Sequence, residues 1–181
     1  MIELALHILD IAENSLRADA TLVEISVVED LVRDRLSITI SDNGHGMTPE
    51  EVERAMDPFY TTKKVRRIGL GLPMLSQASQ STGGSFSINS EPGVGTRITA
   101  EFVHSHIDRQ PLGDIPGAVI ALILEKPEVD ILYTHQRDGS VYTMDTREIR
   151  MELGDVPLNH HEVINLIREN IAEGISEVGG L

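Results

Sequence analysis

The chain has 181 residues, of which 40% are apolar and 24% charged, and its formal net charge is −14. It contains no cysteine, which excludes disulfides, thiol catalysis and thiolate metal sites. The negative charge argues against a nucleic-acid partner, and no apolar run approaches the roughly 20 residues of a membrane span. The N-terminus lacks the basic region of a signal peptide, so we expect a cytoplasmic globular protein.

Periodic patterns predict alternating helices and strands through residue 104. The expected elements are a helix over 4–18, a strand hairpin over 21–29 and 36–41, a helix beginning at Thr48-Pro49-Glu50-Glu51, an aperiodic loop over 57–67, a helix over 72–81, and two strands over 85–90 and 96–103. Thr48 and Glu51 stand in capping-box register, with Pro49 at the first helical position.

Composition changes after His104. Residues 107–116 contain two prolines and a glycine, which is typical of a linker. The elements expected beyond it are a helix over 117–125, a strand hairpin over 129–135 and 140–144, and helices over 145–153 and 159–175, the last capped by Asn159. We therefore expect a domain over 1–104, a linker over 105–116 and a C-terminal appendage over 117–181, whose acidity and apolar helix favour docking or homodimerisation.

The first predicted helix carries a polar stripe. Asp10 and Asn14 are four residues apart and share a face, with Arg17 one turn further along. An asparagine carbonyl oxygen suits Mg²⁺, Arg17 can reach a phosphate, and Asp10 can serve as a general base. The alternative is the solvated face of an ordinary amphipathic helix.

Two glycine-containing turns are candidates for ligand binding. In Asp42-Asn43-Gly44-His45-Gly46, the carboxylate can accept a hydrogen bond from an exocyclic amine, and the glycines admit a flat ring; a plain strand-to-helix turn is the alternative. Gly69-Leu70-Gly71-Leu72 begins a helix directly after the basic run 63–67. Helix N-termini attract phosphate, so this turn indicates an anionic ligand, although it is neither a Walker loop nor a dinucleotide fingerprint.

Together these segments resemble the sequence boxes of the GHKL ATPases, the group that includes gyrase, the heat-shock chaperones, MutL and the sensor histidine kinases. The matching residues are Asn14, Asp42-x-Gly44-x-Gly46, Phe59, Gly69-x-Gly71-Leu72 and Gly93-x-Gly95-Thr96. The resemblance covers about residues 1–104. It implies a Bergerat fold, an α/β two-layer sandwich in which helices cover one face of a mixed sheet.

The resemblance also implies roles for these residues around ATP and Mg²⁺. Asn14 would bind Mg²⁺, Asp42 the adenine amine, and Thr96 the adenine side through water. Residues 57–68 would form the ATP lid. Further nucleotide contacts would come from Arg17, Gly44, Gly46, Met47, Phe59, Lys63, Lys64, Arg67, Gly69, Leu70, Gly71 and Leu72.

Within the group, Pro58-Phe59-Tyr60-Thr61-Thr62-Lys63 and the later glycine boxes are most similar to sensor histidine kinases. Two departures matter. Arg67-Ile68 stands where those kinases usually have Gly-Thr, and Asp10 stands where many carry an amide. Hydrolases and anti-sigma serine kinases carry a glutamate base there, and Glu13-Asn14-Ser15-Leu16 resembles MutL. Asp10 is thus either a general base or a residue with a structural role near Mg²⁺.

No helical hairpin with an exposed histidine precedes the motifs in this sequence, so the resemblance predicts a phosphoacceptor on a separate partner protein in bacterial signal transduction. The alternatives are a nucleotide-gated switch with slow ATP hydrolysis and an anti-sigma-like serine kinase. Among the histidines, we expect His7 to pack or cap. We expect His104, His106, His160 and His161 to be solvated rather than metal ligands.

Overall fold

The computed structural model describes residues 3–57 and 70–179. Its helices are α1 (Leu4–Arg17), α2 (Pro49–Ala55), α3 (Gly71–Ser81), α4 (Ile115–Glu125), α5 (Thr146–Leu153) and α6 (His161–Glu177). Its strands are β1 (Leu22–Asp30), β2 (Arg35–Asp42), β3 (Ser85–Glu91), β4 (Gly95–Val103), β5 (Asp130–Arg137) and β6 (Ser140–Asp145). The strands form one mixed sheet in the order β3-β4-β2-β1-β5-β6.

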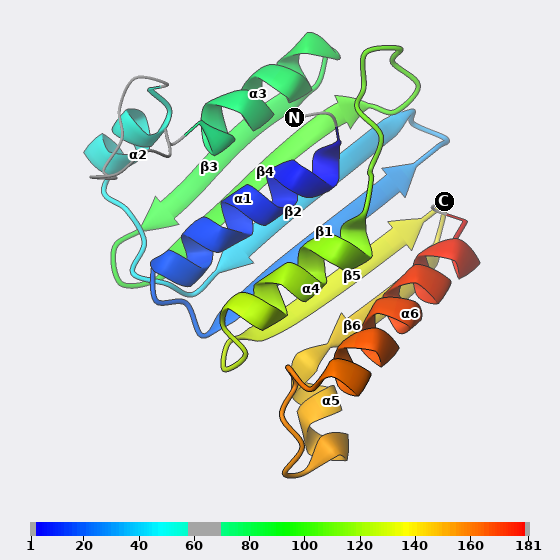
Figure 1. The fold of residues 1–181 in the computed structure, drawn as a ribbon. Helices are drawn as coiled ribbons and strands as arrows, with labels where there is room; N and C mark the ends of the chain where they lie inside the picture. Colours follow the sequence, from blue (N-terminus) through cyan, green and yellow to red (C-terminus); the bar gives the residue numbers. More distant parts are fainter. Residues whose placement is uncertain (1–2, 58–69, 180–181) are drawn as a thin grey trace.

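Helices α3, α1, α4 and α6 lie side by side on one face of this sheet (Figure 1). The alternation in the strands explains why one face is covered. In β2, for example, Leu36, Ile38 and Ile40 are buried, whereas Ser37 and Thr39 between them are partly exposed. The predicted fold class, a two-layer sandwich with a mixed sheet and helices on one face, is confirmed.

Helix α1 lies over the middle of the sheet, and its apolar face is buried in the core. Leu4, Ile8, Ile11 and Leu16 are each at most 1% exposed. His7 is also buried in this face, with its Nε2 atom 3.1 Å from Oε1 of Gln110, so the prediction that it packs is confirmed. The packing of this face fixes α1 on the sheet, so the polar stripe on the opposite side of the helix has a fixed position.

The C-terminal residues extend the same sheet. Strand β5 pairs with β1 in parallel, with Val23 opposite Ile131 and Ile25 opposite Tyr133, and β6 pairs antiparallel with β5. Helix α4 packs beside α1 on the covered face (Figure 1). The division of the chain at residues 105–116 stays a prediction about domain organisation, but the sheet and its core are continuous across it.

Local signals placed most element boundaries within two residues. The predicted capping box is confirmed: Thr48 Oγ1 accepts from Glu51 N at 3.3 Å, and Glu51 Oε2 accepts from Thr48 N at 2.8 Å. Helix α4, however, begins at Ile115, inside the predicted linker, because the Asp114 carboxylate accepts from Gly117 N at 2.9 Å. The predicted cap at Asn159 is wrong, since α6 begins after His160.

In the two described ranges, no helix combines the length and the apolar character that crossing a membrane requires.

Candidate functional site

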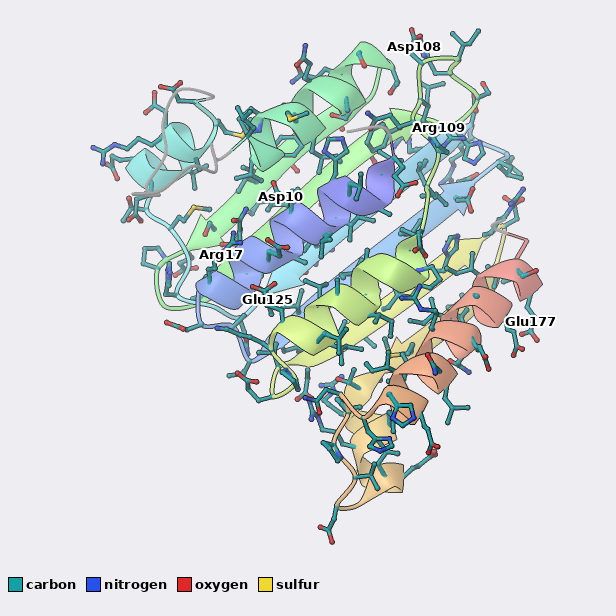
Figure 2. The ribbon with its side chains drawn as sticks, viewed as in Figure 1. Asp10, Arg17, Asp108, Arg109, Glu125 and Glu177 are labelled. Atoms are coloured by element: carbon teal, nitrogen blue, oxygen red, sulfur yellow. The ribbon has the colours of Figure 1, made fainter. Side chains whose placement is uncertain are left out.

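The polar stripe of α1 is present as one cluster. Arg17 donates from one guanidinium nitrogen to Asn14 Oδ1 at 3.1 Å and from the other to Glu13 Oε2 at 2.8 Å. Asn14 and Arg17 are exposed at the C-terminal end of the helix, and Asp10 is half-buried one turn earlier (Figure 2). The Asn14 carbonyl oxygen thus points toward the guanidinium, and its second lone pair is left for a cation.

The Asp10 carboxylate lies against the beginning of α3. A Cβ atom built on Gly71, the first residue of α3, would lie 1.8 Å from Asp10 Oδ2. A larger residue at position 71 would therefore require the Asp10 side chain to move. Leu70, which precedes α3, has no polar side chain to cap the first N–H groups of the helix. The contact consequently places a carboxylate beside a helix N-terminus, which favours negative charge.

Asp42 is held in a fixed orientation by two donors. Ser15 Oγ donates to Asp42 Oδ2 at 2.5 Å, and the Gly44 N–H donates to Oδ1 at 2.9 Å. Each carboxylate oxygen has two lone pairs, so the carboxylate can still accept a bond from an amine. No role for Ser15 was predicted from the sequence. The one indication was that a serine follows Asn14 on the buried side of the helix, where it is 4% exposed and needs a hydrogen-bond partner.

The glycines after Asp42 let two loops interlock. A Cβ on Gly46, whose φ is +66°, would lie 2.0 Å from the Glu91 carbonyl oxygen, and a Cβ on Gly95 would lie 2.0 Å from that of Asp42. The Gly93 N–H also donates to the His45 carbonyl at 2.8 Å. These glycines thus serve contact between the β2–α2 loop and the β3–β4 turn, a structural requirement that the sequence analysis did not anticipate.

Thr96 lies beside Asp42 on the neighbouring strand, where the two residues pair across β2 and β4. Thr96 Oγ1 and Ser90 Oγ share a hydrogen bond of 2.7 Å, and Ser90 Oγ accepts from the Met47 N–H at 2.8 Å. Ser90 therefore ties Thr96 to Met47. It is a second serine whose contribution the sequence analysis missed, because its partners come from two other segments.

The structure therefore gathers most of the predicted site at one end of α1 and β2. The gathered residues are Asp10, Asn14, Arg17, Asp42, Gly44, Gly46, Met47, Gly71 and Thr96. Leu70 and Leu72 flank Gly71 and are half-buried. The predicted contacts Phe59, Lys63, Lys64, Arg67 and Gly69, and nearly all of the predicted lid, lie outside the described residues.

The polar groups of these residues are of the types that a magnesium–nucleotide complex needs. The oriented Asp42 carboxylate offers an acceptor, the α3 N-terminus offers N–H groups, and Asn14 offers a carbonyl oxygen. Within residues 3–57 and 70–179, no three His, Cys, Asp or Glu side chains gather as a metal site. With nucleotides, Mg²⁺ commonly keeps several waters and uses few protein ligands, and the Asn14 oxygen is of the type it prefers.

A second polar cluster lies at the other end of β1. The Glu29 carboxylate pairs with His104 Nε2 at 2.7 Å and with His135 Nε2 at 2.9 Å, and it is 4% exposed. Burial raises the pKa of Glu29, but the two imidazole hydrogen bonds outweigh it, so this pKa lies below its usual value. The expectation of a solvated His104 is wrong. Cavities of about 380 and 300 Å³ adjoin Glu29, remote from Asp42.

Comparison with known proteins agrees with this geometry. The family model described as "Histidine kinase-, DNA gyrase B-, and HSP90-like ATPase" matches residues 2–106. The sensor histidine kinase CpxA of Escherichia coli (strain K12) is 33% identical over 94 residues, which cover 49% of this chain and 20% of that protein. Sporulation kinase E of Bacillus subtilis (strain 168) is 38% identical over 69 residues, covering 38% and 9%. The match thus spans a fifth or less of these relatives.

Two solved structures share the fold. The Aquifex aeolicus MutL ATPase domain complexed with ADP superposes with a TM-score of 0.51 at 22% identity, covering 80% of this chain and 63% of that chain. The N-terminal domain of a DNA repair protein superposes with a TM-score of 0.57 at 15% identity, covering 97% and 59%. At these identities the likeness concerns the fold alone, and in the second case it extends into the C-terminal residues.

Proposed function

The chain belongs to the histidine kinase-, DNA gyrase B- and HSP90-like ATPases, and from this premise we propose that it transfers the γ-phosphoryl group of Mg-ATP to a separate partner protein in bacterial signal transduction. One observation carries the proposal: α1 contacts the oriented Asp42 carboxylate through Ser15 and the N-terminus of α3 through Asp10. The sensor kinase relatives support phosphoryl transfer over other uses of ATP.

The proposed binding mode assigns each group a separate part of the ligand. Asp42, held by Ser15 and Gly44, accepts the adenine amine, and Thr96 contributes on the same side through water. The phosphates lie toward the N-terminus of α3, where the N–H groups that have no partner within the helix and the helix dipole favour anions. Arg17 reaches them from α1 and also keeps the Asn14 carbonyl oriented toward Mg²⁺.

Transfer itself requires positioning and charge stabilisation more than covalent chemistry from the protein. The bound Mg-ATP supplies the phosphoryl group and neutralises charge that develops on it. A neutral histidine acceptor needs no base, because its ring nitrogen already carries a lone pair. In this mechanism the residues of α1 align the phosphates, and the partner contributes the nucleophile.

A second candidate is favoured by the place of Asp10. Its carboxylate lies at the start of α3, close to where phosphates would bind, and it can accept a proton there. A base is useful when the acceptor is water or a serine hydroxyl, since each must lose a proton. The contact therefore favours either a nucleotide-gated switch that hydrolyses ATP slowly or an anti-sigma-like serine kinase.

Incubation with γ-labelled ATP and candidate partner proteins separates these functions. Acid-labile label on a partner supports transfer to histidine or aspartate, acid-stable label supports a serine acceptor, and free phosphate alone supports the switch. Asp10→Asn, compared with the remote and exposed Asp108→Asn, tests the base. If Asp10→Asn binds ATP but loses turnover, Asp10 acts as the base; unchanged turnover in both variants shows that it does not.

A further inference from the structure

Helix α1 is held at both ends by residues that follow the family match. At its N-terminus, the N–H groups of Leu4 and Ala5 donate to the carbonyls of Pro111 and Leu112 at 2.9 and 2.8 Å. At its C-terminus, Lys126 Nζ donates to the Leu16 carbonyl at 2.6 Å. Figure 2 shows Arg109, in the segment that leads to Pro111, near the first end, and Glu125, which precedes Lys126, near the second.

The lysine contact satisfies a group that the helix leaves open. The last four carbonyls of a helix have no partner within it. The Ala18 N–H bonds to the carbonyls of Asn14 and Ser15, and the Leu16 carbonyl receives the Lys126 ammonium. A cation at this end also opposes the negative pole of the helix dipole, so the contact is both a charged hydrogen bond and a favourable charge.

The same turn of α1 carries two groups of the nucleotide site. Asn14 and Ser15 are within two residues of Leu16, and Ser15 holds the Asp42 carboxylate. Helix α4, which ends just before Lys126, lies on the side of α1 away from α3 (Figure 1). Lys126 thus lies on the side of α1 away from α3, and the contact that the structure gives it toward the site is the one with Leu16 of α1.

We propose that Lys126 is a positioning residue of the nucleotide site. Its ammonium fixes the last turn of α1, so that Asn14 faces the magnesium and Ser15 keeps Asp42 directed toward adenine. The C-terminal segment is thereby coupled to nucleotide affinity through one contact. The inference rests on the proposed nucleotide binding.

The test is Mg-ATP affinity by calorimetry on the full chain. Lys126→Met keeps much of the side-chain length but removes the donor and the charge. We expect it to raise the Kd about fivefold, which is within the usual range for coupling between sites. Lys126→Arg retains a cationic donor and should stay within about twofold of the wild type. Arg33→Met is the matched control, since it removes a positive charge from a side chain that is 80% exposed.

Several outcomes decide the proposal. A folded Lys126→Met variant with unchanged affinity overturns it, as does equal weakening in Lys126→Met and Lys126→Arg. Circular dichroism confirms that each variant is folded. In the ¹H–¹⁵N spectrum without nucleotide, Lys126→Met should shift the signal of the Asn14 side-chain amide, and Arg33→Met should leave it unchanged. If Lys126→Met is unfolded, Lys126→Gln replaces it with the same expectation. If the wild type itself fails to bind Mg-ATP, the proposed function fails instead.

Discussion

At the scale of single residues, the contact between Asp10 and Gly71 is the most demanding feature of the site. It brings a half-buried carboxylate to within 1.8 Å of the place that any larger residue at position 71 would need for its Cβ. A glycine that looked like part of a phosphate-binding turn in the sequence thus also makes room for the Asp10 side chain.

Gly71→Ala should destabilise the fold by about 1–3 kcal/mol, because the new methyl group overlaps the Asp10 carboxylate. Combining it with Asp10→Ala removes the overlap, so the pair should cost less than the sum, by about 0.5–3 kcal/mol. Urea unfolding of the wild type, both single variants and the double variant measures this coupling. Strict additivity would contradict the contact.

The buried His7 predicts a pH dependence of stability. Burial, its largest cause, keeps the pKa of His7 below its usual value of 6.5, despite the hydrogen bond to Gln110. The unfolded chain therefore takes up a proton near pH 6.5 that the folded chain resists. Hence the contribution of His7 to stability falls as the pH decreases through 6.5 toward the folded pKa.

The measurement is the free energy of unfolding at about pH 7.5 and pH 5.5, on either side of the ordinary histidine pKa. His7→Gln should lose less stability than the wild type over this interval, because it removes the group that titrates. His161→Gln, at an exposed position, should keep the slope of the wild type. Equal slopes in all three proteins would exclude His7 as a source of the pH dependence.

At the scale of elements, the sequence predicted correctly those helix ends and helix lengths that depend on residues close together in the chain. The capping box at Thr48 and Glu51 is a local signal, and the apolar spacing from Leu4 to Leu16 defines α1 within one residue of its end. Asn159 does not cap α6, because the chain turns through the bond of the His160 N–H to the Pro157 carbonyl at 3.1 Å and the helix begins one residue later than the cap requires. Helix boundaries of this kind are uncertain by one or two residues from sequence alone.

A pair of substitutions tests this reading of the caps. The Asp145 carboxylate caps α5 by accepting from the Arg147 N–H at 2.9 Å, so Asp145→Ala should cost about 1 kcal/mol. Asn159→Ala should change the stability by less than about 0.5 kcal/mol, as most surface substitutions do. Thermal unfolding of both variants provides the comparison, and a larger loss in Asn159→Ala would restore Asn159 as a structural residue of α6.

The candidate site was predictable in its parts but not in its connections. Asp42 and Thr96 stand in recognisable motifs, whereas Ser15 and Ser90 matter because each bonds to a residue far away in the chain. The sequence around a serine does not indicate which distant residue its hydroxyl group will bond to. The roles assigned to the site residues stay predictions until nucleotide binding by the protein and its variants is measured.

At the scale of the whole molecule, the C-terminal residues are built into the nucleotide fold. The parallel pairing of β5 with β1 joins segments more than 100 residues apart, and no local pattern specifies such a partner. Ile131 in β5 is fully buried and stands opposite Val23 of β1, which belongs to the same core. The division into a domain and an appendage stays a prediction, while the pairing of the two segments in one sheet is a feature that the sequence did not indicate.

A continuous core predicts a single cooperative unfolding transition. Because the natural chain has no cysteine, one can be introduced at either of two buried alanines, Ala100 in β4 or Ala118 in α4. The reactivity of each thiol during urea unfolding should report the same midpoint, once each variant's own stability is taken into account. Exposure of the α4 thiol well before global unfolding would show that the C-terminal segment opens independently.

Mg-ATP should bind where α1 meets Asp42, and calorimetric titration of Mg-ATP measures this most directly. Asp42→Asn removes a charged acceptor and Asn14→Ala an oxygen ligand. Each loss of a charged or metal-linked bond of this kind is worth about 1.5–3 kcal/mol, or roughly 10- to 150-fold in Kd. The wild type and the remote variant Asp108→Asn should bind Mg-ATP with the same Kd, and the Kd of each site variant should rise at least about tenfold. Equal affinity in all four proteins would contradict the site.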